Sequence, residues 1–183
     1  MASIIGVETL QHTNGTTAAT IDSSGLVTLP NSVYLSRYIL GSDQTSDGTI
    51  TNWISPSQSK QVGAIGTAVS ASSGIFTFPK TGVWKVSFQA RVLSVNGDST
   101  VGVEIQVTDD NNNYSVYGFG GAGHGTGTMT ASLNVCEIIN VDNVLNVKAK
   151  FVATSITSGG KFYSTFNNDN RTQVIFERIT DAT

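Results

Sequence analysis

Apolar and polar residues alternate with a period of two over most of the chain from residue 61 onward. Lys85–Val92 places its apolar residues at even positions, and Val101–Val107 and Leu145–Phe151 place theirs at odd positions. A strand that buries one face and exposes the other has this period. An apolar spacing of i, i+3, i+4, i+7 does not persist anywhere for three turns. The pattern therefore predicts half-buried antiparallel strands.

Turn-forming residues separate these strands at Asn96–Gly97, Asp109–Asn113, Val141–Asn143 and Ser158–Gly160. Short strands at this spacing are typical of a sandwich or a barrel. Gly118–Thr128 has six glycines among its eleven residues, and we expect a flexible loop there. A phosphate-binding loop would need a Gly-Lys-Ser/Thr sequence and a following helix, whereas the residues that follow have a strand pattern.

The N-terminal part of the chain is predicted to form separate, smaller units. Residues 1–30 carry short apolar stretches around the turn dipeptides Asn14-Gly15 and Ser24-Gly25, which predicts two or three short strands joined by hairpins. So small a sheet is not stable alone, so we expect it to pack on the rest of the chain, a sister subunit or a host structure. Residues 31–56 are predicted to be a connector containing one strand, and residues 57–183 the sandwich domain.

The composition favours the same fold class and excludes several partners. Charged residues make up 13% of the chain, against about 25% in typical soluble domains, so Ser, Thr, Asn, Gln and Gly must supply the polar surface. These residues disfavour helix interiors. With a formal net charge of -3 and no basic run, nucleic-acid binding is not expected. No segment approaches the roughly 20 apolar residues of a membrane span, and the start lacks the pattern of a signal peptide.

Candidate residues for chemistry are few. Cys136 lies in an apolar run, and we expect a buried small hydrophobic side chain rather than a nucleophile. Neither a nucleophile with a base nor a pair of carboxylates in one pocket emerges, and the alternation places Glu104 on an outward face. We therefore expect no enzymatic activity and no cofactor.

Two further features leave a metal site open. The residues Asp109, Asp110, Asn111 and Asn112 lie in a run rich in side-chain oxygens, as in a cation-binding loop, but the run lacks the spacing and the closing glutamate of a helix–loop–helix calcium site. A solvated hairpin tip is favoured, with a weak calcium site as the alternative. His124 is predicted to be an exposed loop residue, although three copies could meet on the axis of a trimer.

Gly74–Val92 reads GIFTFPKTGVWKVSFQARV. This segment resembles a strand pair of the jelly-roll superfamily that includes tumour necrosis factor and the globular head of complement component one q. The residues that match the pattern of that superfamily are Gly74, Phe76, Thr77, Phe78, Pro79, Gly82, Val83 and Trp84. Residues 133–151 and 162–179 resemble later strands in the same order. The resemblance implies an all-β antiparallel jelly-roll sandwich that assembles as a homotrimer.

Residues 6–30, GVETLQHTNGTTAATIDSSGLVTLP, are similar to the openings of structural proteins of marine and cyanobacterial phages. This implies a virion protein, made in the bacterial cytoplasm, that attaches to other virion proteins of the capsid or tail through its N-terminal segment. The residues expected to make this attachment are Ile4, Ile5, Val7, Leu10, Ile21 and Leu26.

The trimer interface is expected to use aromatic residues beyond those that fill the core. The candidates, some of which belong to the monomer core, are Tyr114, Tyr117, Phe119, Phe162, Tyr163 and Phe166. The outward loops with Asp109–Asn112 and His124 are expected to touch a glycan or protein of the host surface. The alternatives are a soluble carbohydrate- or calcium-dependent ligand-binding module and, less favoured, a polysaccharide depolymerase.

Overall fold

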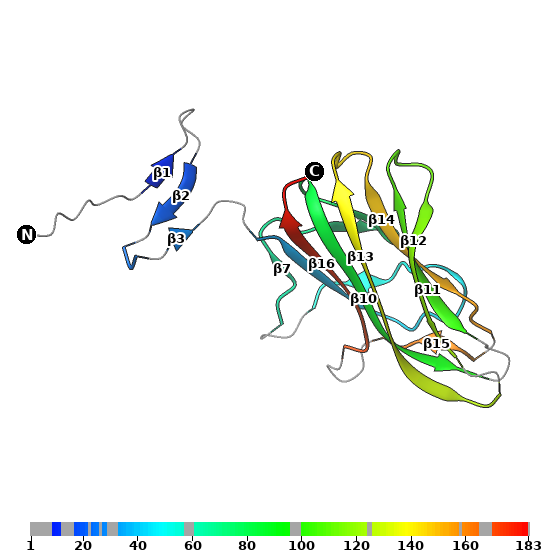
Figure 1. The fold of residues 1–183 in the computed structure, drawn as a ribbon. Helices are drawn as coiled ribbons and strands as arrows, with labels where there is room; N and C mark the ends of the chain where they lie inside the picture. The colour runs from blue at the N-terminus through cyan, green and yellow to red at the C-terminus, as the bar shows by residue number, and fades with distance from the viewer. Residues whose placement is uncertain are drawn as a thin grey trace, which may run out of the picture. The chain divides into compact units, whose positions relative to one another are not determined.

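The computed structural model describes residues 9–11, 17–21, 23–25, 27–28, 33–56, 61–95, 100–123, 126–157, 159–164 and 170–182. The chain divides into two compact units, Met1–Ser32 and Val33–Thr183 (Figure 1). The described residues form antiparallel strands and no helix, which confirms the all-β prediction. Accordingly, these residues include no helix with the length and apolarity needed to span a membrane.

The first unit is a three-stranded antiparallel sheet in the order β1-β2-β3. Its strands are β1 (Thr9–Gln11), β2 (Thr17–Ile21) and β3 (Val27–Thr28). The hairpin between β2 and β3 passes through Gly25, whose φ of +80° lies in the region that glycine enters without strain. The prediction of two or three short strands in this segment is thus confirmed, and the Asn14-Gly15 turn lies outside the described residues.

The second unit is a sandwich of two antiparallel sheets. In the first sheet the order is β13-β10-β16-β4-β6, with β15 also paired to β10 and β7 to β4. The strands of this sheet are β4 (Leu35–Leu40), β6 (Trp53–Ile54), β7 (Ala64–Ile65), β10 (Gly82–Ser94), β13 (Met129–Val141), β15 (Lys161–Phe162) and β16 (Thr172–Thr180).

In the second sheet the order is β12-β11-β14-β9-β8, with β5 also paired to β14. The strands of this sheet are β5 (Gly48–Thr49), β8 (Ser70–Ser72), β9 (Ile75–Thr77), β11 (Val101–Thr108), β12 (Ser115–Ala122) and β14 (Lys148–Thr154). The hairpin partners β11 and β12 and the long pair β10 and β13 account for much of the pairing (Figure 1).

The sandwich begins earlier than predicted. β4 pairs with the C-terminal strand β16, β6 pairs with β4 in the same sheet, and β5 pairs with β14 in the other sheet. The described part of the segment that was predicted to be a connector therefore belongs to the sandwich domain. The prediction of a domain start at residue 57 was therefore wrong. Pairing between strands more than 130 residues apart leaves no local signal, because neither strand is a sequence neighbour of the other.

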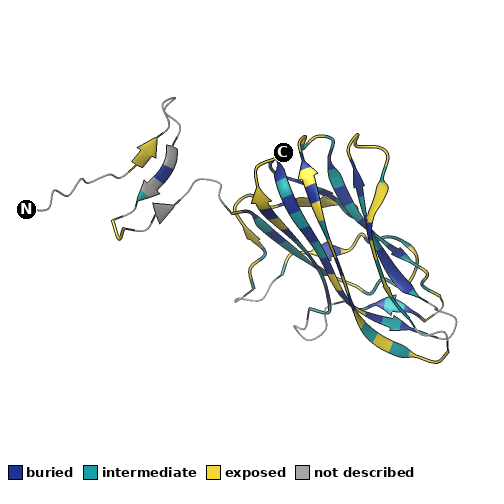
Figure 2. Cartoon of the chain, viewed as in Figure 1, coloured by how far each residue is buried: buried dark blue, intermediate teal, exposed yellow. Residues whose placement is uncertain are grey.

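The predicted alternation is confirmed along β10, where buried and more exposed residues alternate from Gly82 to Ser94 (Figure 2). The odd-numbered row of β11 is buried as predicted, as are Val147, Ala149 and Phe151 around β14. Leu145 is the exception, because 76% of its surface is exposed. It lies in a turn where the Asn143 side chain accepts a hydrogen bond from the Leu145 backbone N–H (2.9 Å), so the strand starts only afterwards.

Gly118–Ala122 is part of strand β12 and not of the predicted loop. At these glycines another strand lies too close to leave room for a side chain. A Cβ atom at Gly118 would lie 2.6 Å from Glu137 Oε1, and one at Gly120 would collide with Val135. Both partners lie on β13 of the other sheet. Glycine at these positions lets the edges of the two sheets come together along one side of the sandwich.

Candidate functional site

A cavity of about 630 Å³ opens beside β15, within the size range of small-molecule sites. We call it the Tyr163 pocket, and it is lined by Gly41, Ser42, Asp43, Lys161, Tyr163, Ser164 and Arg171. These residues come from the loop after β4, from β15 and the residues after it, and from the position just before the last strand. The fold therefore brings distant segments of the chain together at this point.

Backbone pairing holds the walls of the Tyr163 pocket. The Gln44 N–H donates to the Phe162 carbonyl (3.1 Å), and the Phe162 N–H donates to the Gln44 carbonyl (3.0 Å). Phe162 is fully buried and packs edge-on against Phe88, at 5.8 Å between ring centroids. The core thus fixes β15, and β15 in turn fixes the loop that carries Asp43.

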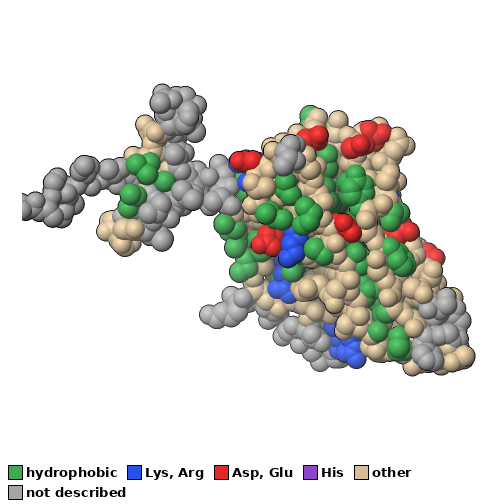
Figure 3. Space-filling model, viewed as in Figure 1, with side chains coloured by type: hydrophobic (Ala, Val, Ile, Leu, Met, Phe, Trp, Pro, Cys, Tyr) green, Lys and Arg blue, Asp and Glu red, His purple; other side chains and the backbone are tan. Residues whose placement is uncertain are grey.

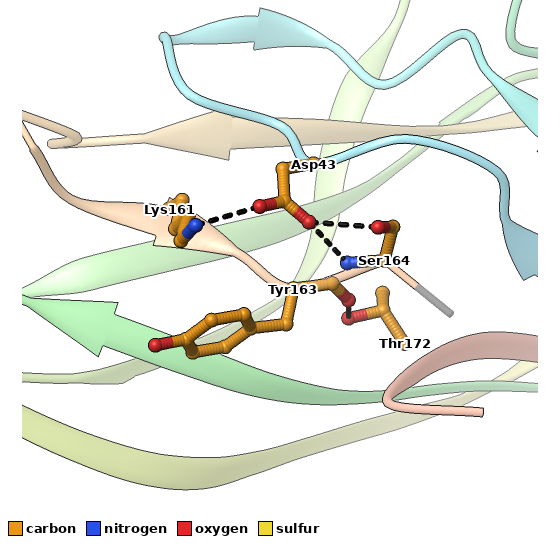
Figure 4. Close-up of polar contacts among 5 residues, drawn as sticks. All are labelled: Asp43, Lys161, Tyr163, Ser164 and Thr172. Atoms are coloured by element: carbon orange, nitrogen blue, oxygen red, sulfur yellow. Dashed lines mark hydrogen bonds and ion pairs between the residues drawn. The ribbon is translucent and has the colours of Figure 1, made fainter. Parts of the chain in front are cut away.

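Asp43 joins the two walls (Figure 4). Lys161 Nζ donates to Asp43 Oδ2 at 2.7 Å, and both the backbone N–H and the hydroxyl of Ser164 donate to Asp43 Oδ1 at 2.7 Å. Partial burial raises the pKa of the Asp43 carboxyl, but the hydrogen bonds from Lys161 and Ser164 outweigh it and hold the pKa below its usual value. The same hydrogen bond to Asp43 raises the pKa of the Lys161 ammonium.

Three cationic side chains surround the ring of Tyr163. Lys161, Arg171 and Arg91 lie 4.8, 5.6 and 5.7 Å from its centroid, within the range of cation–π attraction. The backbone presets this arrangement: the Arg91 N–H donates to the Arg171 carbonyl (2.8 Å), and the Tyr163 N–H donates to the Arg91 carbonyl (3.0 Å). The Thr172 hydroxyl also donates to the Tyr163 carbonyl (2.6 Å; Figure 4).

Three of the ten Lys and Arg residues of the chain thus meet around one ring, with one neighbouring carboxylate among the described residues. Among the residues that the structure describes, this is a local excess of positive charge in a chain with only 13% charged residues. Because Asp43 is held by Lys161 and Ser164, its role here is to position them. The arrangement is suited to binding an anionic group.

The Asp43–Lys161 pair is expected to stabilise the fold between about pH 4 and about pH 10, the ordinary values of the two groups. The lowered pKa of Asp43 means that its contribution is present above pH 4 and lost as the pH falls through the folded value. The raised pKa of Lys161 means that its contribution is present below pH 10 and lost as the pH rises further. Urea midpoints of the wild type and D43N, measured from pH 3 to pH 8, should differ at neutral pH and converge in acid.

The matched control for this measurement is E177Q. Glu177 and Lys85 are both about half exposed, and their charged atoms are 3.9 Å apart, so solvent screens the pair. E177Q should leave the midpoint nearly unchanged over the same pH range. A D43N difference that does not shrink at all below pH 4 would show that the carboxylate charge is not the source of the stabilisation.

The predicted interface aromatics fall in different places. Tyr117 and Phe119 lie on β12 with 52% and 58% of their surface exposed, and Tyr114 is half-buried with Lys150 Nζ 4.1 Å from its ring centroid. Tyr163 lines the pocket described above. Phe162 is fully buried in the monomer and has no surface left for a subunit contact, so its assignment to the interface was wrong. Phe166 lies outside the described residues.

The attachment residues predicted in the first unit are only partly described. Leu10 on β1 is half-exposed, at 50%, and Ile21 at the end of β2 is partly buried. An exposed leucine in so small a sheet leaves apolar surface available for contact. The other predicted attachment residues lie outside the described part of the chain: Ile4, Ile5, Val7 and Leu26.

The loop at Asp109–Asn113 is a hairpin tip between β11 and β12, with Asp109, Asn111 and Asn112 exposed as predicted. Asp110 Oδ1 accepts hydrogen bonds from the Thr108 hydroxyl (2.8 Å) and from the N–H groups of Asn112 (2.8 Å) and Asn113 (2.7 Å), and Oδ2 accepts one from the Asn113 side chain (2.6 Å). The backbone N–H of Asn113 is the strongest of the donors that hold the pKa of Asp110 well below its usual value.

The loop itself therefore already uses both carboxylate oxygens of Asp110, which a calcium ion would need as ligands. Within the ranges that the structure describes, no group of three or more His, Cys, Asp and Glu residues forms a candidate metal site. His124, the other predicted host-facing residue, lies outside these ranges.

Cys136 is exposed, so the prediction of a buried cysteine was wrong. It shares its face of β13 with Asn134 and Ile138, and the Ser87 hydroxyl on β10 donates to its sulfur at 3.5 Å. Apolar residues occur on both faces of the run around it, but the parity of the buried Val135 and Ile139 would have placed Cys136 outward.

The Tyr163 pocket was not predicted from the sequence, because its charged residues lie in separate segments. Asp43 is in the predicted connector, Arg91 is on a strand, and Lys161 and Arg171 lie about 70 to 80 residues further along the chain. The sequence carried only a weak indication of a charged site at Arg91. This residue and Lys85 are the two cations in the outward row of Lys85–Val92.

Comparison with known proteins supports the fold. No protein-family model matches the chain, and no curated protein matches it. Among solved structures, murine APRIL at pH 5.0 superposes with a TM-score of 0.58 and 10% identity, covering 80% of this chain and 99% of that one. Eiger TNF from S. frugiperda superposes with a TM-score of 0.60 and 10% identity, covering 81% of this chain and 94% of that one. The sandwich therefore has a tumour-necrosis-factor-like jelly-roll fold, as predicted.

Proposed function

We propose that this chain is a phage virion structural protein that displays a homotrimeric jelly-roll head, attached to the particle by its N-terminal unit. The head binds a molecule of the host surface and performs no catalysis. The observation that carries the proposal is the tumour-necrosis-factor-like sandwich together with a separate small unit before it. Its placement on a phage particle rests on the similarity of residues 6–30 to phage structural proteins.

Exposed apolar residues along one edge of the sandwich support the assembly of several copies. Val116, Tyr117 and Phe119 on the edge strand β12 are each more than half exposed, as is Ile138 on the neighbouring edge strand β13. Aromatic residues are enriched at protein interfaces. Elsewhere on the face drawn in Figure 3, apolar side chains lie in small spots among polar atoms and few charges.

The first unit suits an attachment role because three short strands bury little of their own surface. Its one described residue with a fully hidden apolar side chain is Ala19. Contact with another virion protein would cover the half-exposed Leu10 and supply the stabilisation that the sheet lacks.

The mass of the full chain in solution tests the assembly. We expect a molecular mass of three times the 19.2 kDa of one chain. The double variant Y117S/F119S should shift it to the monomer, because both rings would leave the subunit contact. The control L145S also removes an exposed apolar side chain but lies in a turn, and it should remain trimeric. A monomeric wild type would contradict the trimer.

Removal of residues 1–32 tests the division of roles. The shortened chain keeps the whole sandwich and should stay trimeric, while its retention on purified particles is lost. Retention of the shortened chain on particles would contradict an attachment role for the first unit.

The second candidate function is a soluble carbohydrate-binding module that acts without a particle. The Tyr163 pocket favours it, because a cavity of this size with hydroxyl and cationic groups can hold a sugar. The two candidates differ in the retention experiment, since a free module would not bind to virions in either form.

A further inference from the structure

We infer that the Tyr163 pocket binds an acidic sugar, with the carboxylate of the sugar placed against Arg171 and Lys161. This inference rests on the proposed binding of a host-surface molecule and names the chemical class of its ligand.

The charges around the Tyr163 ring favour an anionic ligand. Lys161, Arg171 and Arg91 carry three positive charges around the Tyr163 ring, and Asp43 is the carboxylate among the described lining residues. Arg171 lies close enough to Lys161 for the two charges to repel each other, which opposes the effect of Asp43 on Lys161. An anion between them would relieve this repulsion. Arginine also presents a planar set of N–H donors that matches a carboxylate.

The size of the cavity favours a molecule larger than a simple anion. Its volume of about 630 Å³ exceeds the space that one small ion fills, and it lies within the size range of sites that hold small organic molecules.

Two hydroxyl groups in the pocket wall favour a sugar. One is able to donate a hydrogen bond to a ligand, and the other is able to accept one. The Ser42 oxygen accepts a hydrogen bond from the Asn52 side chain (2.6 Å), so its own proton is directed elsewhere and can be donated to a ligand. The Ser164 hydroxyl donates to Asp43, so its oxygen can accept from a ligand. A sugar has hydroxyl groups that both accept and donate, and it satisfies the two serines at once.

The backbone of the Tyr163 pocket is preorganised for binding. The carbonyls of Arg91, Tyr163 and Arg171 all accept hydrogen bonds from neighbouring segments, and Gln44 and Phe162 pair across the pocket wall. The backbone positions of the binding groups are therefore set by the fold before a ligand arrives, which lowers the cost of binding.

Calorimetric titration of the full chain tests the inference with four probes: 3'-sialyllactose, a galacturonic acid trimer, lactose and inorganic phosphate. The two acidic saccharides should bind, and lactose should bind at least tenfold more weakly. Binding of the acidic probes should weaken as salt is raised from 0.05 to 0.5 M, because ions screen the charges. If lactose binds as well as 3'-sialyllactose, the role of the cations is refuted. If phosphate binds as tightly as the acidic saccharides, the site is an anion site and not a sugar site.

Variants of Arg171, with a second arginine as the matched control, complete the test. R171Q should weaken binding of the acidic saccharides at least tenfold, and R171K should retain part of it, since the charge stays while the planar donors are lost. The control R37Q removes an arginine whose Nε donates to Gln173 on the outer face of the first sheet, and it should change binding less than twofold. Equal binding by R171Q and R37Q would overturn the inference.

The outcome for the pocket can be separated from the outcome for the virion protein. R171Q should keep the trimeric mass and the retention on particles while it loses the saccharide. If wild-type protein is trimeric and retained on particles but binds no acidic saccharide, the inference fails and the proposed virion role stands. If it binds the saccharide as a free monomer, the virion role fails and the pocket stands.

Discussion

The variant F76A is expected to destabilise the sandwich by about 3–5 kcal/mol, the usual cost of emptying a buried phenylalanine site. Phe76 on β9 is fully buried, and its ring lies within 6.0 Å of the ring centroids of Tyr38, Trp53, Phe151 and Phe176. These partners come from both sheets, from strands β4, β6, β14 and β16. Truncation would therefore remove contacts that join the two layers, and rigid strands on both sides limit how far the space can close.

Urea unfolding measures the effect, at one fixed chain concentration because the stability of an oligomer depends on concentration. L145A is the matched control, since it also shortens an apolar side chain but at a site with 76% exposure. It should change the free energy of unfolding by less than about 0.5 kcal/mol. A loss for F76A no larger than that of L145A would mean that the aromatic cluster does not hold the sheets together.

The sequence predicted this core well because the relevant signal is local. In Gly74–Val92, Phe76, Phe78 and Trp84 are all buried, and the Trp84 ring N–H finds the Lys80 carbonyl at 3.1 Å across the turn that contains Pro79. Period-two alternation reports which face of a strand is buried, wherever the strand continues. The alternation predicted a buried side chain at Leu145, and this was wrong. The Asn143 side chain stabilises a turn there, so the strand has not yet begun, although apolar and polar residues still alternate in the sequence.

Features that depend on long-range pairing were not predicted. One partner of the strand at Leu35–Leu40 lies at the far end of the chain, and nothing in the residues of that strand indicates this partner. The glycines at 118 and 120 suggested a loop, because a glycine that is needed for contact with another sheet looks the same in sequence as one that is needed for flexibility. The Tyr163 pocket was not predicted either, because its charged residues lie in separate segments and come together only after folding.

The variant G74A is expected to cost about 3 kcal/mol or more, and G127A about 1 kcal/mol. Both glycines have nearly the same positive φ, +79° at Gly74 and +83° at Gly127, so alanine meets the same backbone strain at each. They differ in their surroundings. A Cβ atom at Gly74 would lie 2.5 Å from the Ile50 carbonyl oxygen, whereas one at Gly127 would have open space around it. The difference between the two variants therefore measures the close approach alone.

The Ile50 carbonyl has little freedom to move away. Its oxygen accepts a hydrogen bond from the Trp53 ring N–H (2.9 Å), and the Ile50 N–H donates to the Phe151 carbonyl of β14 (2.9 Å). Trp53 packs in the aromatic cluster, so a shift of Ile50 to accept a methyl group would disturb the same core that F76A empties. Urea midpoints of the two glycine variants decide the matter. Equal losses of stability in G74A and G127A would show that backbone strain alone explains the glycine at position 74. A larger loss for G74A would show that this position also has no room for a side chain.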